Sequence, residues 1–160
     1  MIAILQKPLA LACRARALLN AVPYSVLVLV ARGATFSVFF RSGLVKLADW
    51  NATLSLFQNE YNVPVLLPQV AATLAASMEL GLSSLVLVGL FTRLSALGLL
   101  GMVAVIQIFV YPMAWPDHIQ WLAFMIFIVC RGPGVFSLDH GIAQLFGISQ
   151  RNSHARPIGF

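Results

Sequence analysis

Long apolar stretches with almost no charge dominate this chain and limit what it can fold into. Three such stretches each carry one charged side chain; they lie at about 18–40 with Arg32, 66–90 with Glu79, and 93–112 with Arg93. A helix of about 20 residues spans the roughly 30 Å of a bilayer's hydrocarbon core. We therefore predict three membrane-spanning helices.

The composition agrees with a membrane location and excludes an ordinary soluble domain. Of the 160 residues, 60% are hydrophobic and 9% are charged, whereas soluble domains carry about 25% charged residues. The net charge of +5 comes from basic residues scattered singly between apolar runs, so we expect no nucleic-acid partner. Cys13 and Cys130 form no Cys-x-x-Cys motif, which argues against a dithiol site or a cysteine zinc site.

A fourth and shorter span is predicted at about 116–131. Its uninterrupted apolar run, 119–130, has only 12 residues, a length that also suits a buried core helix. Pro116 suits the first turn of a helix, and the Gly-Pro-Gly sequence at 132–134 ends it. Beside three longer spans we accept this one, and we predict an all-α, four-helix transmembrane bundle.

The distribution of basic residues predicts that both termini lie in the cytoplasm. With the N-terminus inside, seven basic residues fall on the inner side and two, Arg41 and Lys46, on the outer side. Lys and Arg favour the cytoplasmic side of membrane spans. The inner set comprises Lys7, Arg14, Arg16, Arg93, Arg131, Arg151 and Arg156. We expect a multi-pass protein of the bacterial plasma (inner) membrane.

The four spans define one membrane domain over 18–147 with a short segment on either side. We predict that the basic residues 1–17 lie at the membrane interface and that 148–160 form a polar cytoplasmic tail. A cleaved leader is the less favoured interpretation of the start. The apolar run continues to Phe40 without stopping at a small-residue cleavage site.

The connection between the first two spans carries its own helical pattern. Four apolar side chains share one helical face by their spacing: Trp50, Leu54, Phe57 and Tyr61. We predict a short amphipathic helix over 50–60 that lies on the outer mouth of the bundle. A solvated loop is the alternative.

Two charges deep within the predicted spans lead to the main structural hypothesis. Arg32 lies about nine residues from the outer end of its span and Glu79 about eleven, which corresponds to depths of about 14 and 17 Å. A charge inside a span costs about 2.5–3.5 kcal/mol on insertion scales, so each charge needs a partner. We therefore predict an ion pair between Arg32 and Glu79.

The predicted pair either locks the bundle or lines a polar pocket for a quinone, a proton or a small anion. Gln107 and His118 join Arg32 and Glu79 as candidate ligand-binding residues, because both lie toward the outer side of the third and fourth spans. The same small and polar faces also serve as packing seams between helices. No metal site is predicted, since the outer loop offers only three mixed donors: Met113, Asp117 and His118.

Several short motifs resemble those of the DoxX family of small membrane proteins. They are Arg32, Gly43-x-x-Lys46, Pro68, Glu79, Gly89-Leu-Phe-Thr-Arg93 and Arg131-Gly-Pro-Gly-Val-Phe-Ser-Leu-Asp139. The resemblance covers about residues 25–140 and implies a four-span bundle with both termini in the cytoplasm. Members similar to this chain include the membrane subunit of a thiosulfate:quinone oxidoreductase and proteins associated with redox and thiol homeostasis.

The other motif residues are expected to act structurally: Gly43, Lys46, Gly89, Arg93, Gly132, Pro133, Gly134 and Asp139. In the closing motif, glycine and proline end the fourth span. Ser137 or Asp139 can then cap the following segment, which we expect along the inner interface.

The residues and the resemblance together favour an integral membrane subunit or accessory protein of a quinone- or thiol-linked redox system. No cofactor is assigned, and quinone is a candidate. A small transporter or channel-like module and a structural anchor are the alternatives. We expect the lipid bilayer, membrane or soluble proteins, and a second copy of the chain as partners. The spans contain a single acid and no histidine pair for a haem, which favours a subunit over an autonomous enzyme.

Overall fold

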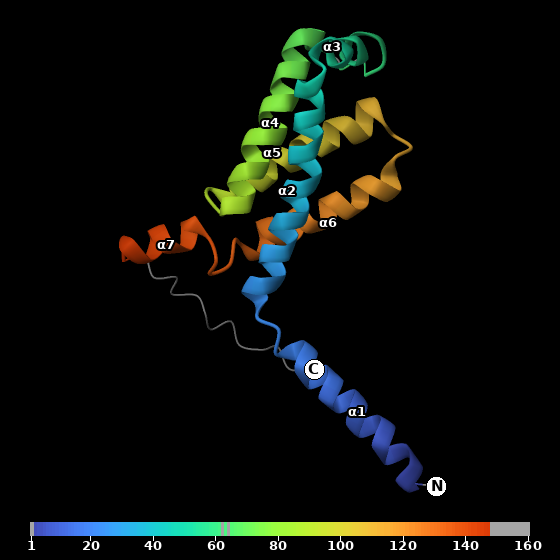
Figure 1. Cartoon of the computed structure of the whole chain (residues 1–160), viewed down its shortest axis with the longest axis vertical. Coiled ribbons are helices and arrows are strands. Elements are labelled where there is room, and N and C mark those ends of the chain that lie inside the picture. The colour runs from blue at the N-terminus through green and yellow to red at the C-terminus, as the bar shows by residue number, and fades with distance from the viewer. Residues whose placement is uncertain (1, 62, 64, 148–160) are drawn as a thin grey trace.

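The computed structural model of the chain describes residues 2–61, 63 and 65–147, and these residues form helices without any strand (Figure 1). There are seven α-helices and one five-residue π-helix, η1, among them. Their bounds are α1 Ile2–Asn20, α2 Tyr24–Ala48, α3 Trp50–Asn59, α4 Pro68–Val88, α5 Thr92–Val105, η1 Ile106–Val110, α6 Trp115–Arg131 and α7 Leu138–Leu145. The all-α prediction is confirmed, and the predicted tail 148–160 lies outside the described residues.

Four helices pack around one core. α2 lies against α4 and α6, and α5 lies between α4 and α6 in the same assembly (Figure 1). Connections between consecutive helices place the end of α2 beside the start of α4, where α3 also packs. We call this the α3 end, and we call the opposite end, where α4 meets α5 and α6 leads to α7, the α7 end.

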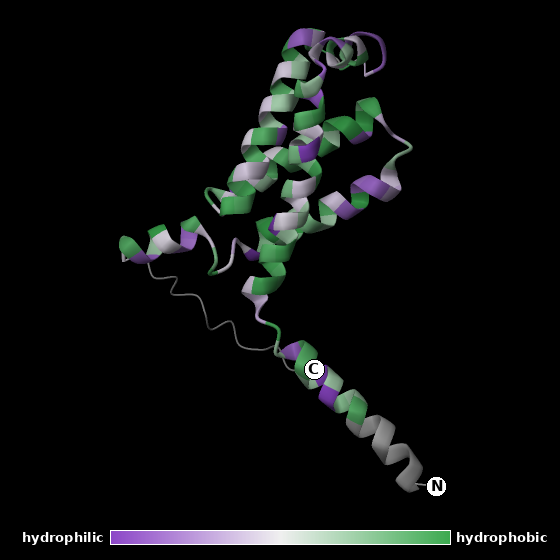
Figure 2. Ribbon diagram, viewed as in Figure 1, coloured by the Kyte–Doolittle hydropathy of each residue, from purple (hydrophilic) through white to green (hydrophobic). Residues whose placement is uncertain are grey.

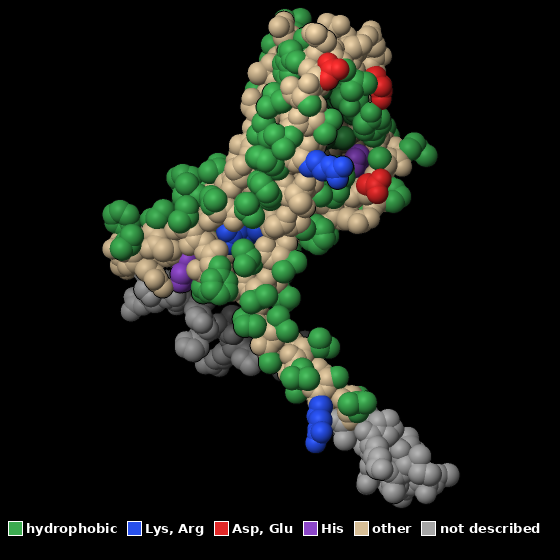
Figure 3. Space-filling view, viewed as in Figure 1, with side chains coloured by type: hydrophobic (Ala, Val, Ile, Leu, Met, Phe, Trp, Pro, Cys, Tyr) green, Lys and Arg blue, Asp and Glu red, His purple; other side chains and the backbone are tan. Residues whose placement is uncertain are grey.

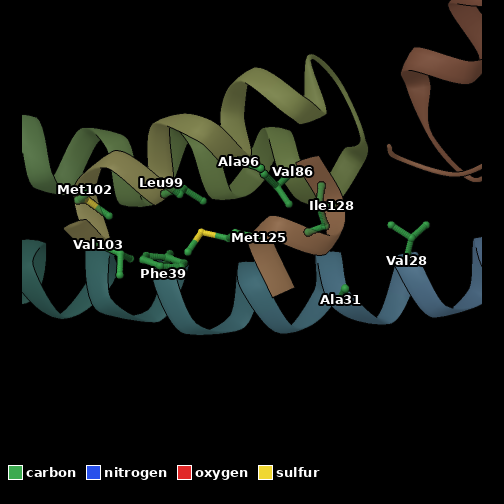
Figure 4. Close-up of a cluster of buried hydrophobic side chains, with 10 residues drawn as sticks. All are labelled: Val28, Ala31, Phe39, Val86, Ala96, Leu99, Met102, Val103, Met125 and Ile128. Carbon is green, nitrogen blue, oxygen red and sulfur yellow. The ribbon is translucent and has the colours of Figure 1, made fainter. Parts of the chain in front are cut away.

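The core is apolar and is built from all four helices. It comprises Val28, Ala31, Phe39, Val86, Ala96, Leu99, Met102, Val103, Met125 and Ile128. Figure 4 shows Phe39, Leu99 and Met125 directed into the space between the helices. This core holds the four helices together and so fixes the positions of the polar side chains found toward the α3 end and the α7 end.

The outer faces of the same helices are also apolar, which is the property of a protein surrounded by lipid. Large side chains such as Val30, Leu74 and Leu97 are exposed on three different helices, and Figure 2 shows hydrophobic residues distributed along these helices. A helix that is apolar all round is buried in a larger protein or crosses a membrane. Three segments are long and apolar enough to cross: Tyr24–Ala48, Pro68–Val88 and Thr92–Val110.

The first of these segments differs from its predicted bounds of about 18–40. Helix α1 ends at Asn20. A new helix, α2, begins after Pro23 and continues to Ala48. The apolar run of the sequence joins the last turn of α1 to the first turns of α2. The prediction was misled by this continuity, because hydropathy does not register the break before Tyr24.

The predicted short helix after the first span is present as α3. Asp49 caps it by accepting a hydrogen bond from the backbone N–H of Ala52 at 2.9 Å. Phe57 is buried against Ala71 and Ala72 of α4, so α3 packs its apolar face onto the bundle.

Candidate functional site

The only ion pair among the described residues joins α2 to α4 near the α3 end. Lys46 Nζ lies 2.8 Å from both carboxylate oxygens of Glu79. Ser42, one helical turn before Lys46, donates a hydrogen bond to Glu79 Oε1 at 3.1 Å and accepts one from Lys46 at 2.9 Å. The Glu79 side chain is only 4% exposed, so its charge is compensated inside the protein.

Gly43 makes this pair possible by letting the two helices approach closely. A Cβ atom at position 43 would lie 2.7 Å from Leu80 Cγ and 3.2 Å from Glu79 Cβ. Such separations are below ordinary contact, so a larger residue would push α2 away from α4. Gly43 and Lys46 therefore act together, one setting the helix spacing and the other supplying the charge.

The predicted ion pair between Arg32 and Glu79 is wrong. Arg32 lies toward the α7 end, where its guanidinium donates to the carbonyl oxygens of Val86, Leu87, Pro133 and Phe136. The predicted depth of Arg32 assumed that the span ends near residue 40, but α2 continues to Ala48. The eight extra residues place Arg32 about 12 Å deeper below the end of its helix than predicted, so it no longer lies level with Glu79.

Arg32 closes the end of α4 instead. The last carbonyls of a helix lack partners within the helix, and Arg32 supplies donors to two of them while also holding the loop after α6. Its side chain is buried, at 1% exposure for the residue. Because every hydrogen bond that it donates goes to a backbone oxygen, Arg32 serves the fold at this end, and it does not line the cavity that Glu79 faces.

The motif residues from Gly89 onward lie at the same end of the bundle as Arg32, whereas Pro68 begins α4 at the opposite end. Gly89 has φ +77°, and a Cβ there would lie 2.7 Å from Arg32 Nη2. Asp139 accepts hydrogen bonds from the backbone N–H groups of Phe91 and Thr92, at 2.8 and 2.9 Å, and from the Thr92 hydroxyl at 2.8 Å. Asp139 thereby caps the start of α5, while Ser137 Oγ caps α7.

Glycines at 132 and 134 let the loop after α6 pass close to its neighbours. Both have positive φ, +85° and +78°, which favours glycine. A Cβ at Gly134 would lie 2.6 Å from Val28 Cγ1, and Pro133 between them presents its carbonyl to Arg32. The Arg93 side chain lies against Gly132.

His118 and Gln107 form a second polar unit near the α3 end. Gln107 Nε2 donates to the carbonyl of Pro112 at 2.7 Å, which orients its amide, and its Oε1 then lies 2.6 Å from His118 Nδ1. An amide oxygen can only accept, so Nδ1 carries a proton and the neutral ring has its acceptor lone pair on Nε2. Nε2 has no hydrogen-bond partner in the described part of the chain. Gln107 lies in η1, and π-helical turns often occur at functional sites.

A cavity of about 420 Å³ lies between these two polar units. Lys46, Glu79 and Ser42 line it from one side, and His118 lines it from another. The rest of its wall is mainly apolar or small, with Phe39, Ala75, Met78, Gly98, Gly101, Met102, Val105 and Trp121 among the lining residues. Pockets for organic ligands typically have 300–1,000 Å³ with apolar walls and a few polar groups.

Aromatic contacts link the cavity to α3. Phe57 packs edge-on against Tyr61, and Tyr61 against Tyr111, with centroids 4.9 and 5.6 Å apart. The Tyr111 hydroxyl donates to Glu60 Oε1 at 2.7 Å, which ties the end of η1 to the end of α3. This hydrogen bond, with burial, raises the pKa of the Tyr111 phenol above its ordinary value of 10.0.

Of the predicted ligand-binding residues, the structure brings Glu79 and His118 to one cavity, with Gln107 holding His118 from behind. It separates Arg32 from them. Sequence reasoning missed Ser42 and Lys46 as partners of Glu79. The two residues are four positions apart, which places them on one face of the same helix, and this spacing could have indicated a shared polar partner.

These features define an all-helical, multi-pass membrane protein with a charged pair facing a partly open cavity. The DoxX family model matches residues 27–112, more than half of the chain, and the chain belongs to this family. The match includes Arg32, Lys46, Glu79 and Gln107, whereas His118 and the closing motif at 131–139 lie beyond it. No curated protein and no solved structure gives a significant match.

Proposed function

We propose that this protein is a four-span subunit or accessory protein of a quinone-linked redox system, and that the cavity at the α3 end binds the quinone head group. The observation that carries the proposal is the pairing of a 420 Å³, mainly apolar cavity with His118 Nε2. The quinone ring is largely apolar and fits such a wall, and its two oxygens need a few polar groups to orient them.

The protonation pattern of His118 favours the reduced form of the ligand. With Nδ1 donating to Gln107, neutral His118 offers an acceptor at Nε2, and a quinol hydroxyl is a donor. On the opposite wall of the cavity Lys46 is the hydrogen-bond donor, but it already donates to both carboxylate oxygens of Glu79. We therefore propose His118 as the residue that contacts the head group and Gln107 as the residue that positions it.

The topology we propose has both termini in the cytoplasm of a bacterial cell and the α7 end at the inner leaflet. Arg93 and Arg131 line one cleft at that end, whereas Asp49, Glu60 and Asp117 belong to the α3 end or the loops near it. Figure 3 shows acidic side chains on the upper half of this face, around α3 and the start of α6. α6, with 17 residues, is then the short fourth span, in agreement with the preference of basic residues for the cytoplasmic side.

Two matched glycine variants test the cavity. Gly33 and Gly101 both lie within helices with open space where a Cβ would be, but only Gly101 lines the cavity. The full chain in detergent micelles is titrated with decylubiquinol, and quenching of tryptophan fluorescence reports binding near Trp121. We expect saturable binding that Gly101→Leu weakens by about tenfold or more, which is 1.4 kcal/mol, and that Gly33→Leu leaves unchanged.

Two outcomes of the same titration would contradict the proposal. Non-saturable quenching in the unsubstituted chain would leave a transport module or a structural anchor as the function. Equal weakening by both leucine variants would mean that the ligand does not occupy the cavity. His118→Gln provides the second comparison, and its expected effect is a loss of preference for the quinol over the quinone.

A further inference from the structure

A second and larger cavity at the α7 end is lined by basic side chains. It has a volume of about 880 Å³, and its wall includes Tyr24, Arg93, Arg131, Gly132 and His140. The Arg93 guanidinium lies beside Gly132, within 3.1 Å of the position a Cβ would take. The Arg131 guanidinium lies over the Tyr24 ring at 5.5 Å from its centroid. Two positive groups therefore border the same space.

These two guanidinium groups have no carboxylate partner in the part of the chain that the structure describes. All five acidic side chains of the protein belong to that part, and its only ion pair is Lys46–Glu79. Asp139 also borders the cleft, but its oxygens accept three hydrogen bonds from Phe91 and Thr92. The cleft therefore keeps a net positive charge, because the guanidinium groups of Arg93 and Arg131 outnumber the single carboxylate of Asp139.

An exposed apolar stripe runs beside the cleft. Leu138, Ile142 and Leu145 of α7 are 51%, 42% and 85% exposed, and their spacing places them on one face of the helix. Figure 1 shows α7 extending sideways from the lower end of the bundle, and Figure 3 shows basic side chains beside it. An amphipathic helix with this pattern lies in the interface of a membrane, with its apolar face toward the acyl chains.

We propose that the cleft binds the phosphate head group of an anionic phospholipid, with Arg93 and Arg131 as its ligands. Arginine pairs with phosphate through several donors, and basic pockets between helices on the cytoplasmic side recognise anionic head groups. The apolar stripe of α7 supplies a surface for the acyl chains, which a free phosphate lacks. The proposal rests on the membrane location of the protein and is independent of the quinone cavity.

The test measures how tightly the full chain retains phosphatidylglycerol, relative to phosphatidylcholine, by native mass spectrometry from detergent. The variant is Arg93→Gln with Arg131→Gln, and the matched control is Arg14→Gln with Arg16→Gln, which removes the same charge from the exposed face of α1. A basic residue near the membrane surface contributes about 1 kcal/mol. We therefore expect the affinity of the variant to fall about fivefold for each arginine, and that of the control to fall much less.

Several outcomes would overturn the proposal. Equal retention of the two lipids, or equal losses in the variant and its control, would reduce the effect to general electrostatic attraction. Inorganic phosphate that displaces the lipid at similar concentrations would identify a free-phosphate site in its place. If the double variant fails to fold, Arg93→Gln alone is measured. Arg93 donates no hydrogen bond within the described ranges, and a fivefold loss is still expected.

Discussion

Lys46 and Glu79 meet in a two-oxygen ion pair, with Nζ 2.8 Å from each carboxylate oxygen, across the contact between α2 and α4. Glu79 is nearly inaccessible and Lys46 is the better exposed partner. Since a lone charge in this environment is costly, each side chain depends on the other. The pair therefore makes a clear prediction about single and double substitutions.

Lys46→Met is expected to destabilise the protein by about 3–5 kcal/mol, because it leaves the buried Glu79 carboxylate without its countercharge. The double variant Lys46→Met with Glu79→Met should recover most of this loss. Thermal unfolding in detergent, followed by tryptophan fluorescence, measures both. Additive losses in the double variant would show that the two side chains do not depend on each other.

Arg32→Lys is expected to cost about 2 kcal/mol or more, although the charge is kept. The guanidinium donates through three nitrogens to carbonyls of α4 and of the loop after α6, and one ammonium cannot reach them all. A buried carbonyl without a partner costs about 1–3 kcal/mol. The exposed Arg41 provides the control, since Arg41→Lys should stay within about 0.5 kcal/mol. Similar unfolding temperatures for both variants would refute this role of Arg32.

Gly89→Ala should destabilise by about 3 kcal/mol. An alanine there adopts a left-handed backbone, which costs about 1 kcal/mol, and its Cβ would lie 2.5 Å from Ser137 Cβ, where overpacking adds about 2 kcal/mol. Gly33→Ala is the comparison, because its Cβ meets nothing within 4 Å in a helix. That variant should be stabilised by up to about 1 kcal/mol. The two changes in unfolding temperature should therefore have opposite signs.

The hydrogen bond from Tyr111 to Glu60 predicts a dependence on alkaline pH. The pKa of Tyr111 is raised in the folded protein above its ordinary value of 10.0, so the folded chain holds this proton more tightly than the unfolded chain. The resulting stability is fully present below about pH 10 and is lost as the pH rises through the folded pKa. The difference in unfolding temperature between the unsubstituted chain and Tyr111→Phe should therefore shrink above about pH 10.

Glu60→Ala removes the acceptor that is the first cause of this raised pKa. Its stability should therefore respond to alkaline pH as that of Tyr111→Phe does. Parallel profiles for the unsubstituted chain and both variants, across the alkaline range, would mean that the hydrogen bond contributes nothing to the pH dependence.

The helical class could be predicted from the length of the apolar stretches, and the short helix after the first span from the spacing of its apolar residues. Phe57 lies on the apolar face that the sequence assigned to it and is buried against α4. The bounds of α2 were harder to predict, since hydropathy stays high from Leu18 across the break at Pro23. The error at the other end of the span, residue 40 in place of Ala48, changed the partner assigned to Arg32.

The partners of Arg32 could not be read from the sequence for a physical reason. All its acceptors are backbone carbonyls, and every residue carries one, so no residue type marks them. The partner of Glu79 was easier to recognise from the sequence. Lys46 was one of two basic residues on the side predicted to be outside, and such an exception to the charge rule indicates that another requirement holds the residue there.

The position of Arg32 also joins three segments that are far apart in the sequence. Its acceptors lie 54 and 55 residues later in α4 and 101 and 104 residues later in the loop after α6. When α2 and α4 first pair, the guanidinium has only half of its partners. These bonds are complete only when the loop after α6 is in place, so a chain truncated before residue 133 would leave the Arg32 guanidinium with half of its acceptors.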